Sequence, residues 1–251
     1  MPTLHILHTN DFHNHMSDGQ AKVICRAKAG LENALLLDAG DAISAGNVGV
    51  RPGGEPILTR MTAVGYDAMT MGNREFHVAD ALLRAKIGKA EFPILCANVR
   101  WREDRGEALP VASSLERTLA NGLRVGVFGL TVPMVTERMA ARVVSAFLFD
   151  DPVSVARAQI AHLRPTVDVL VALTHIGLRQ DEKLAAACPE LDLIIGGHSH
   201  DTLPTPKVVN GVPIVQTGWF GHNFGHVTLE VEAGRVTHVA GELTPLKERA
   251  R

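Results

Sequence analysis

The hydrophobic positions of the chain form short apolar runs between turn residues, and these runs alternate with segments of helical periodicity. Such runs are typical of buried strands. Strands are expected at residues 4–8, 34–38, 68–71, 93–97, 123–130, 167–173 and 191–195. Helices are expected at residues 20–29, 56–64, 78–87, 152–162 and 180–187. The alternation predicts an α/β protein whose sheet is largely parallel in its first half.

The last part of the chain has a different pattern. Residues 212–216, 224–230 and 236–242 are apolar runs separated by turns too short for a helix. Between the last two, a hairpin is predicted to turn at Ala233-Gly234. The simplest use of these strands is a second, antiparallel-rich sheet that packs on the first. No linker, repeat or low-complexity segment interrupts the sequence, so one domain is expected over residues 1–251.

Composition and charge narrow the classes of function. The formal net charge of −2 implies no broad basic face, which argues against a dedicated binder of nucleic acid or anionic membranes. Three widely separated cysteines without CxxC spacing suit reduced thiols. The amino terminus leads straight into a strand without a signal-peptide pattern, and no apolar run approaches membrane-spanning length. A soluble, cytoplasmic protein is therefore expected.

Polar, metal-competent side chains follow nearly every predicted strand. They are Asp11 and His13, Asp41, Asn73, Asn98, His175, and His198 with His200. In open α/β sheets, sites are built in the crevice at the carboxyl ends of the strands. Each cluster alone has an ordinary interpretation, since Gly40-Asp41 suits a turn and a lone His175 suits a packed core histidine. Their common position at strand ends favours a metal site.

The types of these side chains indicate which ions they suit. Imidazole with carboxylate, and without thiolate, suits manganese, iron, cobalt, nickel or zinc. About seven ligands exceed what one tetrahedral ion needs, so two ions that share a carboxylate are the economical arrangement. Asp41 is the natural bridge, because its carboxylate can give one oxygen to each ion. Two such ions clamp a phosphoryl group.

At these residues the sequence resembles the calcineurin-like metallophosphoesterase superfamily, and within it the catalytic domain of the 5′-nucleotidase/UDP-sugar hydrolase branch. The matching strings are LHTNDFH at 7–13, LDAGD at 37–41, MGNREF at 71–76, ILCAN at 94–98, ALTH at 172–175, IGGHSH at 195–200 and VQTG at 215–218. The resemblance implies a four-layer α-β-β-α sandwich, two mixed sheets flanked by helices. It implies one ion held by Asp11, His13, Asp41 and His200, and another held by Asp41, Asn73, His175 and His198.

Two positions depart from the pattern of the branch. Arg74 stands where the motif has histidine, and His77 stands where the branch usually has aspartate. Arginine does not donate a proton near neutral pH, but its planar fork can hold phosphate oxygens. Proton donation to the leaving group then falls to His77, His15 or water. Slow hydrolysis of alkyl esters is expected, with less impairment on good leaving groups.

Length is the other departure. The branch carries a second domain that supplies the aromatic clamp for the nucleotide base, and this chain stops at Arg251, so that domain is expected to be absent. The substrate is then a small phosphorylated molecule, or a partner chain completes the pocket. Asn98 and His222 are predicted to contact it. Trp219 and Phe220 are expected to pack over the second sheet or to wall the substrate.

The leading hypothesis is a dinuclear phosphomonoesterase or phosphodiesterase in which a metal-bound hydroxide attacks phosphorus, with manganese as the favoured ion. The sequence has neither the G-x-S-x-G elbow nor the P-loop of other hydrolases. The alternative is a weakly active or non-catalytic relative that binds metal and phosphorylated ligands, because Arg74 replaces the motif histidine. A structural scaffold, the third class, predicts no stoichiometric metal.

Overall fold

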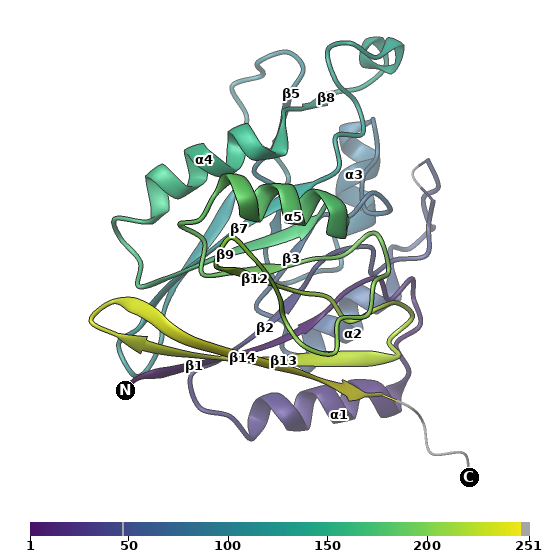
Figure 1. Ribbon diagram of the computed structural model, residues 1–251. Coiled ribbons are helices and arrows are strands. Elements are labelled where there is room, and N and C mark those ends of the chain that lie inside the picture. Colours follow the sequence, from purple (N-terminus) through teal and green to yellow (C-terminus); the bar gives the residue numbers. More distant parts are fainter. Residues whose placement is uncertain (47, 247–251) are drawn as a thin grey trace.

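Two six-stranded sheets form the centre of the computed structural model, which describes residues 1–46 and 48–246 (Figure 1). In the first sheet the strands lie in the order β14-β13-β1-β2-β3-β4. Their bounds are β1 Thr3–Thr9, β2 Ala34–Asp38, β3 Ala68–Thr70, β4 Ile94–Leu95, β13 Asn223–Glu232 and β14 Arg235–Pro245. The strands β1 to β4 are parallel, whereas β13 and β14 are antiparallel additions beside β1.

The second sheet has the order β11-β12-β10-β9-β7-β6. Its strands are β6 Ser114–Thr118, β7 Arg124–Thr131, β9 Val169–His175, β10 Leu193–Ile195, β11 Lys207–Val209 and β12 Val212–Val215. The four central strands are parallel, and the edge strands β6 and β11 are antiparallel. Each sheet is therefore mixed and contains four consecutive parallel strands.

The predicted placement of the last three strands in one antiparallel sheet is wrong. The strand β12 lies parallel to β10 in the second sheet, whereas β13 and β14 extend the first sheet. Val227, Leu229 and Val231 of β13 pack into the same core cluster as Leu4 and Ile6 of β1. Pairing beside β1 buries this apolar face of the hairpin between the two sheets. The predicted turn at Ala233-Gly234 is confirmed, and both residues have positive φ.

Helices cover the outer face of each sheet. Three helices pack against the first sheet: α1 (Asp18–Ala29), α2 (Pro56–Val64) and α3 (Asp80–Ile87). Their apolar side chains share a hydrophobic cluster with Leu7 and Leu36 of the sheet. On the second sheet lie α4 (Pro152–Leu163) and α5 (Leu178–Ala187), which pack on Phe128 and Leu170. The alternate side chains of the same strands, such as Leu35, form a separate core between the sheets. The predicted four-layer sandwich is confirmed.

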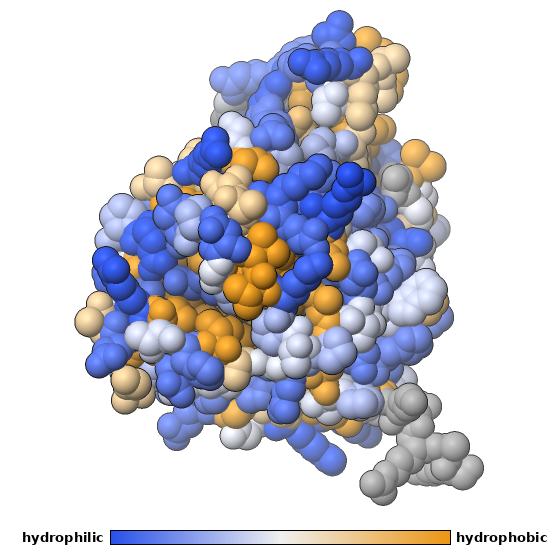
Figure 2. All heavy atoms as spheres, viewed as in Figure 1, coloured by the Kyte–Doolittle hydropathy of each residue, from blue (hydrophilic) through white to orange (hydrophobic). Residues whose placement is uncertain are grey.

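A small two-stranded sheet projects beyond these layers. It pairs β5 (Val99–Trp101) with β8 (Phe147–Phe149), and the 3₁₀ helix η1 (Ala140–Val143) precedes β8. The turn that holds η1 carries exposed apolar side chains, visible at the top of Figure 2, and Val143 and Val144 are each 70% exposed. Among the described residues, no helix has the length and apolar character needed to cross a membrane.

Candidate metal centre

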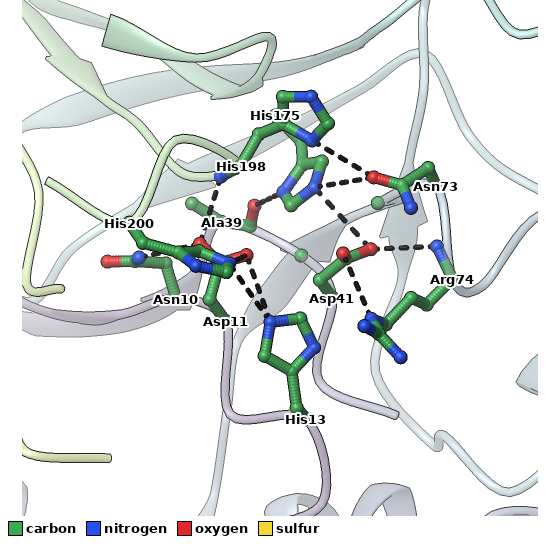
Figure 3. A network of polar contacts seen from close by, with 12 residues as sticks. Asn10, Asp11, His13, Ala39, Asp41, Asn73, Arg74, His175, His198 and His200 are labelled. Carbon is green, nitrogen blue, oxygen red and sulfur yellow. Dashed lines mark hydrogen bonds and ion pairs between the residues drawn. The ribbon is translucent and has the colours of Figure 1, made fainter. Parts of the chain in front are cut away.

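The seven predicted metal ligands come together at the carboxyl ends of strands from both sheets. Asp11, Asp41 and Asn73 follow the neighbouring strands β1, β2 and β3 of the first sheet. From the second sheet, His175 ends β9 and His198 follows β10. Figure 3 shows their side chains pointing toward one another from these two directions. The site therefore lies where the two sheets meet.

One half of the site consists of Asp11, His13 and His200, which we call the first ligand group. The Nε2 atoms of His13 and His200 lie 3.1 Å apart. Both face the same carboxylate oxygen, with His200 Nε2 3.2 Å and His13 Nε2 3.7 Å from Asp11 Oδ1. Two nitrogens and one oxygen directed at a common point form a donor set suited to a divalent transition ion.

The other half consists of Asp41, Asn73, His175 and His198, which we call the second ligand group. His175 Nε2 lies 3.4 Å from Asp41 Oδ1 and 3.3 Å from Asn73 Oδ1. His198 Nδ1 lies 3.0 Å from the same Asn73 oxygen. The carbonyl of Ala39 can only accept a hydrogen bond, so its 2.7 Å contact places a proton on His175 Nδ1 and makes Nε2 the nitrogen that faces the other ligands.

Asp11 connects the two groups in this geometry. Its ligand atoms cluster with those of His13 and His200, and also with those of Asp41 and His175. Asp11 Oδ2 accepts hydrogen bonds from His198 N at 2.9 Å and from Asn10 Nδ2 at 2.7 Å. Its Oδ1 is buried and has no hydrogen-bond partner within the described part of the chain. A buried carboxylate oxygen without a donor fits a cation, because an isolated buried charge is costly. The prediction that Asp41 is the bridging ligand remains a prediction.

The backbone is strained at the ligands. Asp11, His13, Asp41, His198 and His200 all have positive φ, between 46° and 76°. This region is uncommon for residues other than glycine, and such strain tends to gather at functional sites. The surrounding sandwich therefore holds five of the seven predicted ligands in conformations that an unconstrained chain would avoid.

Glycines let the two sheets approach each other at the site. A Cβ atom on Gly197 would lie 2.8 Å from the carbonyl oxygen of Ala39, 3.0 Å from His175 Nδ1 and 3.1 Å from Asp11 Oδ2. A Cβ atom on Gly72 would overlap the Asp41 carboxylate. Any side chain at these two positions would push the ligand loops apart.

The two groups differ in their electrostatics. Burial, reinforced by the Arg74 cation, lowers the pKa of His13 to about 4. Burial also acts to lower the pKa of His175, but the Asp41 carboxylate more than offsets it and the pKa is raised to about 10. The same pairing keeps the pKa of Asp41 below its usual value despite burial. Without ions, His13 is therefore neutral and His175 is paired as a cation with Asp41.

Of the three predicted catalytic side chains, Arg74 is nearest the ligands. Its backbone N–H donates to Asp41 Oδ1 at 2.7 Å, and its Nε lies 3.5 Å from Asp41 Oδ2. His77 instead accepts a hydrogen bond from Ala79 N at 3.0 Å, and burial lowers its pKa. His15 is exposed, with its ring packed at a tilt against Phe220, 4.3 Å between centroids. Only Arg74 of the three contacts a predicted ligand directly.

The two predicted substrate contacts differ in accessibility. Asn98 is buried, and its amide nitrogen donates to the carbonyl oxygens of Thr131 and Asp150. Its Oδ1 accepts from Thr131 N and from the Cys96 thiol. These contacts use its full hydrogen-bonding capacity, so contrary to expectation Asn98 ties β7 to the loop before α4 and has no group free for substrate. His222 is exposed at the rim of the site, with its ring 6.4 Å from that of Phe220.

Two side chains support the site without having been predicted to do so. The fully buried Glu75 carboxylate accepts hydrogen bonds from the backbone N–H groups of Asp41, Ile43 and Gly72. Asn10 accepts from Thr217 N at 2.8 Å while it donates to Asp11. Both stand beside predicted ligands and within the matching strings LHTNDFH and MGNREF, which were the signal of their role. They hold the ligand loops in register.

Aromatic rings lie against the first ligand group. The ring of Trp219 packs on His200 with centroids 4.9 Å apart, and that of Phe220 meets His13 at 5.4 Å. Trp219 and Phe220 stack on each other with an interplanar angle of 2°. Phe220 N donates to the carbonyl oxygen of Asp11 at 2.8 Å. The loop therefore forms a wall beside the metal site instead of covering the second sheet.

Comparison with known proteins agrees with the resemblance found in the motifs. The chain is 30% identical to the protein UshA of Escherichia coli and 29% identical to a 5′-nucleotidase of Vibrio vulnificus, over 96% and 97% of its own length. It spans 51% of each of these relatives.

Solved structures show the same relationship. The 5′-nucleotidase precursor of Thermus thermophilus superimposes over 97% of this chain and 54% of its own, with a TM-score of 0.78 and 27% identity. The calcineurin-like phosphoesterase YfkN of Bacillus subtilis superimposes over 97% of this chain and 91% of its own, with a TM-score of 0.79 and 25% identity. The family model for calcineurin-like phosphoesterases matches residues 4–202. The chain therefore belongs to the calcineurin-like phosphoesterase family, with the metallophosphoesterase fold.

Proposed function

We propose that this protein hydrolyses phosphoric esters with the help of two divalent ions. The observation that carries the proposal is the convergence of carboxylate and imidazole donors from both sheets around Asp11 Oδ1, a buried acceptor without a donor among the described residues. In this proposal Asp11, His13, Asp41 and His200 hold one ion. The other is held by Asp41, Asn73, His175 and His198. Manganese is the favoured ion, and nitrogen-oxygen donor sets also suit iron, zinc, cobalt and nickel.

When bound, such a pair of ions would polarise the phosphoryl oxygens and lower the pKa of water. The chain itself supplies orientation and charge. Arg74 is anchored by its N–H to Asp41 and by Nη1 to the carbonyl oxygen of Ser44, and its side chain is 36% exposed. Its planar fork is therefore placed to hold two phosphate oxygens. His175 is fixed through Ala39, so that its Nε2 faces the second ligand group.

None of the three predicted catalytic side chains is placed by these contacts to give a proton to the leaving group. Arg74 retains its proton near neutral pH. The Nδ1 atom of His77 accepts a hydrogen bond from Ala79 N, and the ring of His15 packs against Phe220. We therefore propose that water protonates the leaving group, which favours esters of acidic alcohols. Nucleotides and smaller phosphomonoesters are the candidate substrates, since UshA and the 5′-nucleotidases are among the relatives.

The proposal is tested by assaying an aryl phosphate and its diester with Mn²⁺ and after treatment with a chelator. We expect hydrolysis that depends on the ion and falls at least about 10²-fold in Asp41→Asn, since even outer-shell changes at metal sites cost about 10–100-fold. His162→Asn, an exposed histidine in the last turn of α4, is the control and should keep most of the activity. Tight binding of metal and phosphate without turnover would contradict the proposal and favour a non-catalytic relative.

A further inference from the structure

A cavity opens beside the second ligand group, at the carboxyl end of the second sheet. Its volume is about 430 Å³, within the range of small-molecule sites. Five of its wall residues are apolar: Val132, Pro133, Pro152, Val153 and Ile176. The polar wall residues are Asp151, Gln180 and His198. The cavity therefore lies between the ends of β7 and β9 and the first turns of α4 and α5.

The cavity is continuous with the candidate metal centre. His198 belongs to both, since its Nδ1 lies 3.0 Å from Asn73 Oδ1 and the residue lines the cavity. Ile176 directly follows His175, and Val132 N donates to the carbonyl oxygen of His175 at 3.1 Å. The walls are thus built on the same strand ends that carry the second ligand group. A phosphoryl group bound beside His198 would have its ester substituent next to this cavity.

The charge and polarity of the wall side chains determine which ligands the cavity can hold. None of its wall residues is a lysine or an arginine, and the Asp151 carboxylate, which caps α4 through Ser154 N, adds a negative charge at the edge. A second phosphate would be repelled there. The apolar walls favour a hydrocarbon or aromatic surface, and the Gln180 amide can pair with one polar group. An uncharged, largely apolar alcohol fits these walls, whereas a diphosphate does not.

The opposite side of the site is lined by packed aromatic rings. The rings of Trp219 and Phe220 stack there on each other and pack on His200 and His13. Asn10 Nδ2 donates to the carbonyl oxygen of Gly218 at 2.5 Å, which fixes this loop to the first ligand group. Aromatic side chains thus pack beside the first ligand group, whereas the cavity lies beside the second.

We infer that this cavity is the leaving-group site, which takes the uncharged apolar or aromatic alcohol portion of a phosphomonoester. The inference rests on the proposed function, because it places the ester by its phosphoryl group. The cavity then sets substrate preference. Esters whose alcohol fills it are hydrolysed more efficiently than small polar esters of similar reactivity.

The test fills the cavity and compares two substrates. Val153→Trp places a large ring among the walls, and Ala158→Trp places the same ring at an exposed position of the same helix as the control. We expect Val153→Trp to lower kcat/KM for 1-naphthyl phosphate about 10-fold or more, the usual scale for steric discrimination in an apolar pocket. Its kcat/KM for glycerol phosphate should stay within about twofold, and Ala158→Trp should change neither. Equal loss on both substrates, or no loss on either, would overturn the inference.

A binding measurement separates this inference from the proposed function. In methyl-labelled protein, 1-naphthol should shift the NMR signals of Val153 and Ile176 but leave those of the distant, exposed Val143 unchanged. In Val153→Trp, which lacks the first of these signals, the shift at Ile176 should disappear. If the wild-type protein hydrolyses neither ester, the proposed function fails while this titration still tests the cavity as an apolar site. Absence of naphthol-induced shifts at Val153 and Ile176 would overturn the inference whether or not the protein is an enzyme.

Discussion

The first and second ligand groups meet at Asp11 but have different surroundings. Beside the first group, the rings of Trp219 and Phe220 pack on the two histidines. Beside the second, the walls recede into an apolar cavity that His198 shares. Aromatic packing restrains ligand rings and excludes water, whereas an adjoining cavity leaves space for a ligand. One side of the site is therefore built to hold its shape, and the other to admit a substituent.

The charges follow the same division. His13 has a pKa of about 4, so its ring is already neutral and available to an ion. His175, with a pKa of about 10, is paired with Asp41, and that pair must release a proton before the ring can bind an ion. Arg74 adds a further cation beside Asp41. In the first group His13 need not lose a proton when an ion binds. In the second, an ion would have to replace the proton that His175 carries.

Removal of one ligand from each group is expected to have the largest effect. His200→Ala should lose the ion of the first group and His198→Ala that of the second, so that metal analysis falls from two ions per chain to one in each variant. Hydrolysis should fall by at least about 10²-fold in both, since outer-shell changes alone cost about 10–100-fold. His162→Ala, an exposed histidine in the last turn of α4, is the control. Full metal content in both ligand variants would contradict the assignment.

Arg74 sharpens the comparison, because it places a permanent cation beside the second group. Arg74→His should supply a proton donor and raise the rate on an alkyl phosphate. The expected gain is about 10²-fold, the lower end of the range for general acid catalysis. The gain on an aryl phosphate should be much smaller, since its leaving group needs less protonation. Arg74→Gln supplies the control, with neither gain. Equal rates for the wild-type protein and the Arg74→His variant on the alkyl ester would count against a missing acid.

The pH dependence of metal binding should also separate the groups. A proton competes with an ion at His175 wherever the pH lies below its pKa of about 10, so affinity at the second group should fall about tenfold per unit as pH drops from about 8 to about 6. At His13 the competition begins only near pH 4, so protonation of this ring should not weaken the first group over that range. Calorimetric titration with Mn²⁺ at several pH values measures both affinities. An equal dependence of both metal affinities on pH would contradict this difference between the groups.

The smallest expected effect concerns the aromatic wall. Trp219→Ala removes the ring that packs on His200, and aromatic contacts of this kind contribute about 0.5–1.5 kcal/mol. Metal affinity at the first group should therefore weaken a few-fold, while the affinity of the second group and the preference for naphthyl phosphate remain. A loss of that substrate preference in Trp219→Ala would instead locate the leaving group on the aromatic side.

The convergence of the predicted ligands could be foreseen because each follows a strand with a strong local signal. Asp11, Asp41 and Asn73 stand close behind apolar runs, so knowing which strands exist was enough to place them at one edge. The pairing of β13 with β1 joins residues more than 200 positions apart, and local periodicity carries no information about such a contact. The weakly patterned strand β6, SLERT, was missed for a related reason: its side chains are largely exposed at a sheet edge.

Side chains whose role depends on packing were equally hidden. Asn98 looked like one more polar residue at a strand end, but the arrival of Thr131 and Asp150 from elsewhere in the chain consumes its amide. Glu75 gained its role from three backbone N–H groups that only the folded chain brings together. The cavity beside His198 likewise exists only because α4 and α5 begin next to each other.

The most direct test of the central claim is anomalous X-ray diffraction from crystals grown with Mn²⁺, recorded on both sides of the manganese absorption edge. Two anomalous peaks are expected, one bounded by Asp11, His13 and His200 and the other by Asn73, His175 and His198, with Asp41 between them. A single peak, or peaks remote from these side chains, would contradict a two-ion centre.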